Sequence, residues 1–302
     1  MCGIVGLFAK SSEIEESLGA HLAAMLTQMS DRGPDSAGVA VYHEPAPAGS
    51  SKLTLFSPDP FQDWDAIAAE LGKAFGGSAE ASVLASHAVV RVDADTTEAE
   101  AWVRRAHPAL RIMSAGRAIE IYKETGRPEE FVRRFELERF SGTHALGHTR
   151  MATESRVTTE GSHPFSTGED VCLVHNGSLS NHNRLRELLR RERIEFQTEN
   201  DTEVAAGYIA WRLREGASLE EALEGCLEDL DGFYTFLVGT FDGFAVLRDP
   251  IACKPAVLAE TDEWVAMASE WRAIAVLPGA GEARSWEPVP GVAYAWERAA
   301  VA

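Results

Sequence analysis

Cysteine is scarce in this sequence, and its pattern excludes several kinds of protein. The 302 residues include four cysteines, at positions 2, 172, 226 and 253, and no two of them form a Cys-x-x-Cys pair. This spacing predicts no disulfide framework and offers too few suitable ligands for an iron–sulfur cluster in this chain. A reducing cytoplasm is therefore the expected location.

Basic residues and long apolar runs are lacking too. Lysine and arginine number 28 against 47 aspartates and glutamates, which gives a net charge of −19. A nucleic acid needs a basic face on its partner, and an anionic membrane surface attracts one, so we expect neither as a partner. No stretch approaches the ~18 uninterrupted apolar residues of a membrane span. Charged residues from Lys10 onward also interrupt any secretory signal.

What remains is an ordinary globular composition, with 45% apolar and 25% charged residues. Short apolar runs predict strands at 3–8, 36–42, 52–57, 82–92, 109–113, 118–122, 143–151, 171–175, 233–240, 244–248, 256–259, 264–268 and 292–296. Apolar residues at helical spacing predict helices at 18–29, 61–75, 97–106, 128–135, 181–193, 202–214 and 219–230. Because the strands come in adjacent runs with helices grouped between them, we expect an α+β fold of packed antiparallel sheets covered by helices.

A loop rich in proline, glycine and serine at 44–51 marks an internal boundary. Residues 50–140 are predicted to form a small inserted α+β subdomain that carries no catalytic motif. The expected organisation is one domain over 1–302, with its core at about 1–49 and 141–302.

The N-terminal Met1-Cys2-Gly3 is the first candidate for chemistry. If Met1 is removed, Cys2 carries both a thiol and a free α-amine. An α-amine with a pKa of about 7.7–8.0 can take the thiol proton at neutral pH. The thiolate is then the nucleophile, as in N-terminal-nucleophile enzymes. The competing interpretation is an ordinary first strand with a buried cysteine.

Two polar clusters follow predicted strands. Arg150 ends one strand, where a guanidinium can hold a substrate carboxylate or form a structural ion pair. Asn176 and Gly177 follow another strand, and an Asn amide beside a Gly N–H supplies two donors for an oxyanion hole. A strand followed by Asn-Gly is also a turn signal, so that alternative stays open.

A third cluster opens a predicted helix. Asp201 can meet a substrate ammonium at a pocket rim, although Asp or Thr as the helix N-cap is the alternative explanation. A thiol with its own amine, two oxyanion donors, a cation and an anion together complement an α-amino acid with a scissile side-chain amide. That description fits glutamine or asparagine.

These residues lie in segments that resemble the class II glutamine amidotransferases. The segments cover roughly 1–43 and 142–296 and occur in that family's order: Met1-Cys2-Gly3-Ile4-Val5-Gly6, Arg32-Gly33-Pro34-Asp35, Gly147-His148-Thr149-Arg150, Ala152-Thr153, His175-Asn176-Gly177 and Asp201-Thr202-Glu203. The resemblance implies a four-layer αββα sandwich of antiparallel sheets, as in N-terminal-nucleophile hydrolases. It also implies glutamine hydrolysis through a thioester.

The resemblance implies a role for each site residue. These roles are Cys2 as the nucleophile, Asn176 and Gly177 as the oxyanion hole, Arg150 and Thr153 as ligands of the substrate carboxylate, Asp201 as ligand of the substrate amine, and Arg32 as the residue that orders the loop around Cys2. His163 precedes Pro164 and has a supporting place, because it either orients the loop near the site or is structural.

A narrower resemblance concerns two later segments. The segments that carry it are Arg248-Asp249-Pro250-Ile251-Ala252-Cys253-Lys254-Pro255-Ala256-Val257 and Glu287-Pro288-Val289-Pro290-Gly291. They resemble the amidotransferase-type subunit of methylamine–glutamate N-methyltransferase, also called N-methylglutamate synthase. That resemblance implies glutamate synthase-like partner subunits in a hetero-oligomer and glutamine or glutamate as the substrate. It places a flavin (FMN) on the partners, with an iron–sulfur cluster as a second candidate there, and no cofactor in this chain.

Two other interpretations remain open. A metallohydrolase would use His144, His148 and later histidines, but a strand does not pair residues four apart as a helix does, so no metal site is predicted. The second is a scaffold or regulatory subunit that keeps the fold without hydrolysing glutamine. The N-methyltransferase reaction itself uses methylamine and glutamate, which leaves this second interpretation in place.

Overall fold

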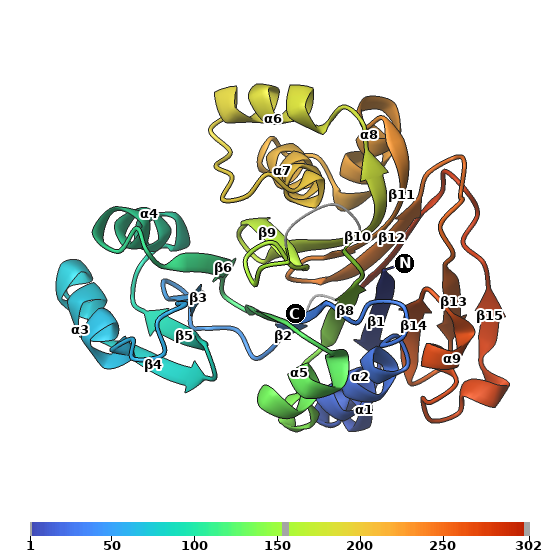
Figure 1. Ribbon diagram of the computed structural model, residues 1–302, viewed down its shortest axis with the longest axis horizontal. Helices are drawn as coiled ribbons and strands as arrows, with labels where there is room; N and C mark the ends of the chain where they lie inside the picture. The colour runs from blue at the N-terminus through green and yellow to red at the C-terminus, as the bar shows by residue number, and fades with distance from the viewer. Residues whose placement is uncertain (1, 153–156, 299–302) are drawn as a thin grey trace.

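The computed structural model describes residues 2–152 and 157–298, and two antiparallel sheets form its centre (Figure 1). Within these ranges, the first sheet has seven strands in the order β15 (Arg284–Trp286), β13 (Val257–Glu260), β14 (Trp264–Ala268), β1 (Gly3–Ala9), β8 (His144–Arg150), β2 (Ser36–Tyr42) and β7 (Ile119–Thr125). The N-terminal strand thus lies inside this sheet, paired on both sides.

The second sheet faces the first. Counted over the same ranges it has five strands in the order β16 (Ala293–Glu297), β12 (Gly243–Arg248), β11 (Gly232–Gly239), β10 (Val171–Leu179) and β9 (Phe165–Gly168). Ile4 and Leu146 of the first sheet pack with Val174 and Leu237 of the second, and all four are fully buried. Burying these apolar faces against each other is the main force that holds the two sheets together.

Helices cover both outer faces, which gives four layers (Figure 1). The first sheet is covered by α1 (Ser12–Glu16), α2 (Leu18–Thr27), α5 (Pro128–Arg134), η1 (Leu137–Arg139) and α9 (Trp271–Ile274). The second is covered by α6 (His182–Arg191), α7 (Asp201–Arg214) and α8 (Leu219–Asp229). A short turn, η2 (Ala280–Glu282), precedes β15. The expected α+β fold, with its αββα sandwich of antiparallel sheets, is confirmed.

A separate sheet extends from one side of the sandwich, on the left of Figure 1. In the described chain it consists of β4 (Ala79–Leu84), β5 (His87–Val92), β3 (Ser51–Phe56) and β6 (Arg111–Gly116), and its own core packs on α3 (Trp64–Phe75) and α4 (Thr96–Ala106). The expected insertion at 50–140 also contained β7 and α5. Since β7 pairs with β2 and α5 packs on the first sheet, the inserted sheet ends at Gly116.

Several element boundaries also differ from the expectation. The single strand expected at 82–92 is a hairpin of β4 and β5 that turns at Ala85, whose φ is 54°. That turn consists of Ala85 and Ser86, and serine is only a weak turn signal. The elements β9, β15 and α1 were not predicted, because they have only three to five residues each.

Candidate active site

Cys2 comes directly before β1 and is partly exposed. It therefore stands at the end of a central strand, and the interpretation as a buried strand cysteine does not hold. Gly3 pairs with Thr149 of β8, and a Cβ on Gly3 would lie only 2.8 Å from both Met29 Cβ and Thr149 Oγ1. Only glycine fits so close to its neighbours, so Gly3 allows this segment to lie against β8 and Met29.

The other three thiols have different surroundings. Burial raises the pKa of Cys172 to about 12 and also raises the pKa of Cys226. Both therefore stay protonated at neutral pH and are poor nucleophiles. Cys253 is exposed, in the segment after β12. Cys2 is the thiol that stands among the predicted site residues.

Arg32 contacts Cys2 directly. Its Nε donates a hydrogen bond of 3.0 Å to the Cys2 carbonyl oxygen, and its Nη1 lies 2.5 Å from Glu270 Oε1. The hydrogen bond from Arg32 and the charge of Arg272 hold the pKa of Glu270 below its usual value. The Arg32–Glu270 pair thus links the chain end to the segment that follows β14.

Asn176 also contacts Cys2. Its Nδ2 donates to the Cys2 carbonyl oxygen at 3.3 Å. Asn176 and Gly177 lie inside β10, so the turn interpretation of Asn-Gly is wrong. Gly177 has a φ of 154°, and a Cβ there would lie 2.0 Å from the Phe233 carbonyl oxygen. The backbone at this position therefore requires glycine.

Arg150 reaches the same region from β8. Because Thr149 is opposite Gly3, Arg150 is level with Cys2 in the sheet register. Its side chain is buried, and its Nη1 donates to the Gly161 carbonyl oxygen at 3.1 Å. Thr153, expected to help bind a carboxylate, lies outside the described residues.

Asp201 is the first residue of α7, and it does not cap that helix. Asn200 is the N-cap, since its side chain accepts from the Thr202 N–H at 2.9 Å. Asp201 Oδ2 accepts instead from the Leu179 N–H at 2.9 Å. The side chain of Asp201 is 23% exposed, so its carboxylate can still meet a ligand.

Three buried histidines connect these residues. His163 Nε2 and His175 Nδ1 lie 2.8 Å and 3.1 Å from Thr202 Oγ1, and the His163 ring stacks on His148 at 4.0 Å. Thr202 Oγ1 also lies 3.4 Å from Asp201 Oδ1. Burial lowers the pKa of His148 to about 3 and lowers the pKa of His163 and His175 too. The rings are therefore neutral at pH 7 and act through hydrogen bonds.

The structure thus brings most of the predicted residues together. Cys2, Arg32 and Asn176 are in direct contact, Arg150 is level with them, and Asp201 and His163 join through Thr202. Sequence reasoning missed Ser269 and Glu270. Ser269 Oγ accepts from the Ile4 N–H at 2.9 Å, beside Glu270. Their role depends on the pairing of β1 with β14 across 265 residues, for which the sequence has no local signal.

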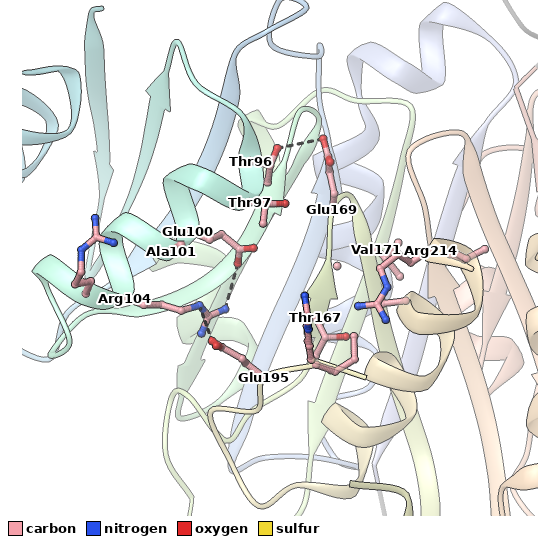
Figure 2. A pocket seen from close by; sticks show the side chains of 16 residues that line it. Thr96, Thr97, Glu100, Ala101, Arg104, Thr167, Glu169, Val171, Glu195 and Arg214 are labelled. Carbon is pink, nitrogen blue, oxygen red and sulfur yellow. Dashed lines mark hydrogen bonds and ion pairs between the residues drawn. The ribbon is translucent and has the colours of Figure 1, made fainter. Parts of the chain in front are cut away.

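A large cleft lies elsewhere. It measures about 790 Å³ and separates α4 of the inserted sheet from β9 and α7 (Figure 2). Arg104 in this cleft pairs with Glu100 at 3.3 Å and Glu195 at 3.4 Å, and Thr96 donates to Glu169. Since no predicted site residue lines the cleft, we assign it no ligand.

The described residues form neither a metal-binding cluster nor a membrane-spanning helix. Over residues 2–152 and 157–298, no group of three or more histidine, cysteine, aspartate or glutamate side chains is placed to hold a metal ion. The metallohydrolase interpretation therefore has no support in that part of the chain. None of the helices described there has the length and apolar character needed to cross a membrane.

Comparison with known proteins defines the class to which this site belongs. Residues 148–276 match the glutamine amidotransferase domain family. Over 298 residues the chain is 54% identical to the glutamine amidotransferase-like protein GlxB of Rhizobium meliloti, with 98% of each chain covered. The chain therefore belongs to the glutamine amidotransferase family.

Two further comparisons narrow the class. A putative glutamine amidotransferase of Methanothermobacter thermautotrophicus is 34% identical over 284 residues, which cover 89% of this chain and 92% of that protein. The glutamine phosphoribosylpyrophosphate amidotransferase of B. subtilis superposes with a TM-score of 0.61 at 21% identity, over 98% of this chain and 49% of that one. The fold is thus that of the class II, N-terminal-nucleophile amidotransferases, as the resemblance implied.

Proposed function

We propose that the chain hydrolyses glutamine, with Cys2 as the nucleophile after removal of Met1. The observation that carries this proposal is the double anchor on Cys2, whose carbonyl accepts from both Arg32 and Asn176. These bonds hold the residue that bears the thiol beside an amide donor and level with Arg150.

The proposed steps use this chain's own groups. The Cys2 thiolate attacks the side-chain amide carbon of glutamine, and its α-amine holds the thiol proton. An amide NH₂ has two N–H donors, so Asn176 can keep its bond to Cys2 and still bind the oxyanion together with the Gly177 N–H. The C–N bond then breaks, and the ammonium of Cys2 returns its proton to the leaving ammonia. Water, activated by the same amine, cleaves the thioester to glutamate.

Ammonia release from glutamine tests the proposal directly. The purified chain should release ammonia and glutamate in equal amounts, alone or with its partner subunits. Intact-mass measurement of the same sample should show the loss of Met1, because a retained Met1 turns the Cys2 amine into an amide that cannot act as a base. A mature chain that hydrolyses no glutamine in either setting would instead support a scaffold role.

Arg150→Ala should weaken substrate affinity. A guanidinium–carboxylate bond is worth about 1.5–3 kcal/mol, so KM for glutamine should rise roughly tenfold to a hundredfold with a smaller change in kcat. Steady-state kinetics measure both constants. Arg117→Ala is a matched control, since Arg117 also donates to a backbone carbonyl, that of Ala46, but lies in the connection between β6 and β7. A fall in kcat at unchanged KM for Arg150→Ala would contradict the assignment.

Arg32→Met should lower turnover. The Cys2 carbonyl loses one of its two anchors, and misplacing a reacting group by about 1 Å can cost roughly a hundredfold in rate. We expect kcat to fall about tenfold or more, measured by ammonia release. Arg272→Met is the control. Arg272 also pairs with Glu270, at 2.8 Å, but its ion pairs are with Glu270 and Asp31 and not with Cys2. Equal losses in the two variants would show that only the charge on Glu270 matters.

The acceptor of the ammonia is proposed to be on a partner. We infer a glutamate synthase-like complex, and methylamine–glutamate N-methyltransferase is the complex that the two later segments favour. Arg248 joins these segments, donating to Ala252 at 2.7 Å, Lys254 at 2.9 Å and Pro288 at 3.2 Å. Flavin, and an iron–sulfur cluster if present, would then belong to the partners. Co-purification from native cells, with mass spectrometry and an absorption spectrum, tests this assignment and its cytoplasmic setting.

A further inference from the structure

Lys123 is a buried lysine whose three hydrogen bonds all go to one short loop. It lies in β7, opposite Gly38 of β2, and is 3% exposed. Its Nζ donates to the carbonyl oxygens of Glu160, Ser162 and Pro164 at 3.2, 2.9 and 3.0 Å. An ammonium has three N–H donors, so each donor has one acceptor in this loop.

The same loop, residues 160–164, touches both halves of the candidate site. Its Gly161 carbonyl accepts from Arg150, and its His163 ring bonds to Thr202, which contacts Asp201. The loop also approaches the first sheet closely. A Cβ on Gly38 would lie only 2.2 Å from the His163 carbonyl oxygen, so glycine is needed at that position.

We propose that Lys123 is a positioning residue for substrate recognition. By holding loop 160–164, it sets the separation between Arg150, which meets the substrate carboxylate, and Asp201, which meets the substrate amine. This inference rests on the proposed glutamine hydrolysis for its kinetic consequences. The hydrogen bonds that carry it do not depend on that function.

The protonation of Lys123 gives the anchor a pH dependence. Burial lowers the pKa of Lys123 to about 8, and the carboxylates of Glu203 and Glu160 oppose that shift. Two histidines also face it, His163 and His87, and both have a lowered pKa and stay neutral. As the pH rises through about 8, Nζ loses one N–H donor and one loop carbonyl loses its partner.

The free energy of unfolding should change with pH in the opposite sense to substrate affinity: it should rise where the affinity falls. The pKa of Lys123 is lower in the folded than in the unfolded chain, so the folded state binds fewer protons above pH about 8. The contribution of this group to the free energy of unfolding therefore rises with pH between about 8 and the unfolded value. A purely structural lysine would not make substrate affinity fall while this contribution rises.

The test compares Lys123→Met with Lys52→Met. Lys52 is a fully buried lysine of β3, within the inserted sheet, and it donates to the Glu44 carbonyl at 2.9 Å and to Glu120 at 3.1 Å rather than to loop 160–164. For Lys123→Met, KM for glutamine should rise roughly tenfold or more, while kcat changes by less than about threefold. The rise of KM above pH about 8 should be present in the wild type and in Lys52→Met, and lost in Lys123→Met.

Hydrogen–deuterium exchange provides a readout that needs no turnover. Lys123→Met should speed amide exchange in residues 158–165, and Lys52→Met should leave that segment unchanged. If the wild type hydrolyses no glutamine, the proposed function fails. Hydrogen–deuterium exchange and calorimetric measurement of glutamine binding still test whether Lys123 holds loop 160–164. The inference would be overturned if Lys123→Met exchanged residues 158–165 at the wild-type rate. It would also be overturned if this variant had the KM and the pH profile of the wild type.

Discussion

Replacing Cys2 by alanine is expected to abolish glutamine hydrolysis by the mature chain. The variant keeps the α-amine, the two donors on the Cys2 carbonyl and the sheet register, but it has no thiol to form the thioester. Removing the nucleophile of a covalent mechanism should lower kcat by about a thousandfold or more. Ammonia release, measured against a no-enzyme blank, gives the size of the loss.

The matched control is Cys253→Ala, which removes an exposed thiol after β12. This variant should hydrolyse glutamine at the wild-type rate. In the Cys253→Ala background, an electrophilic glutamine analogue should add one mass equivalent, on Cys2, because the thiols of Cys172 and Cys226 are buried and protonated. Wild-type turnover in Cys2→Ala would sink the nucleophile assignment.

The second large effect is expected for Asn176→Ala. Loss of one oxyanion donor typically raises the barrier by ~2.7–4 kcal/mol, which is about 10²–10³ in kcat. The variant also loses the 3.3 Å bond to the Cys2 carbonyl, so part of the fall reflects a less ordered nucleophile. KM should change little, because the donor acts mainly on the charge that develops during the reaction.

Asn181→Ala is the control for this change. Asn181 lies just before α6 and makes two backbone contacts, donating to Asp229 at 2.8 Å and accepting from Asp231 at 3.1 Å, so its loss also removes amide hydrogen bonds. It should leave kcat near the wild-type value. If Asn176→Ala instead raised KM and kept kcat, Asn176 would be a ground-state ligand, and the oxyanion role would pass to other donors.

Much of the fold was predictable because its signals are local. Apolar runs located β1, β2 and β10, and helical spacing located α2 and α7. The hairpin around Ala85 was missed because its turn carries only a weak signal, and β9, β15 and α1 were missed because they are short. The end of the insertion was misplaced for a different reason, since nothing in the local pattern of β7 tells whether it pairs with β2 or with the inserted sheet.

In the candidate site, too, local features could be predicted from the sequence and contacts between distant residues could not. Cys2, Arg150, Asn176 and Asp201 could be proposed because the type of each residue indicates its chemistry and each lies at the end of a predicted element. Their contacts could not, because Arg32 reaches Glu270 across 238 residues and Asn176 reaches Cys2 across 174.

By itself the sequence determined which side chains are available for chemistry: the thiol of Cys2, the Asn176-Gly177 pair of donors, and the opposite charges of Arg150 and Asp201. The tertiary structure alone decided how these groups are held. It assigned the helix cap to Asn200 and turned Asp201 toward the Leu179 N–H, and it placed Lys123 against the loop that joins Arg150 to Thr202. The physical reason is that capping, turns and periodicity act over a few residues. The approach of a buried ammonium to three carbonyls depends instead on the packing of distant strands.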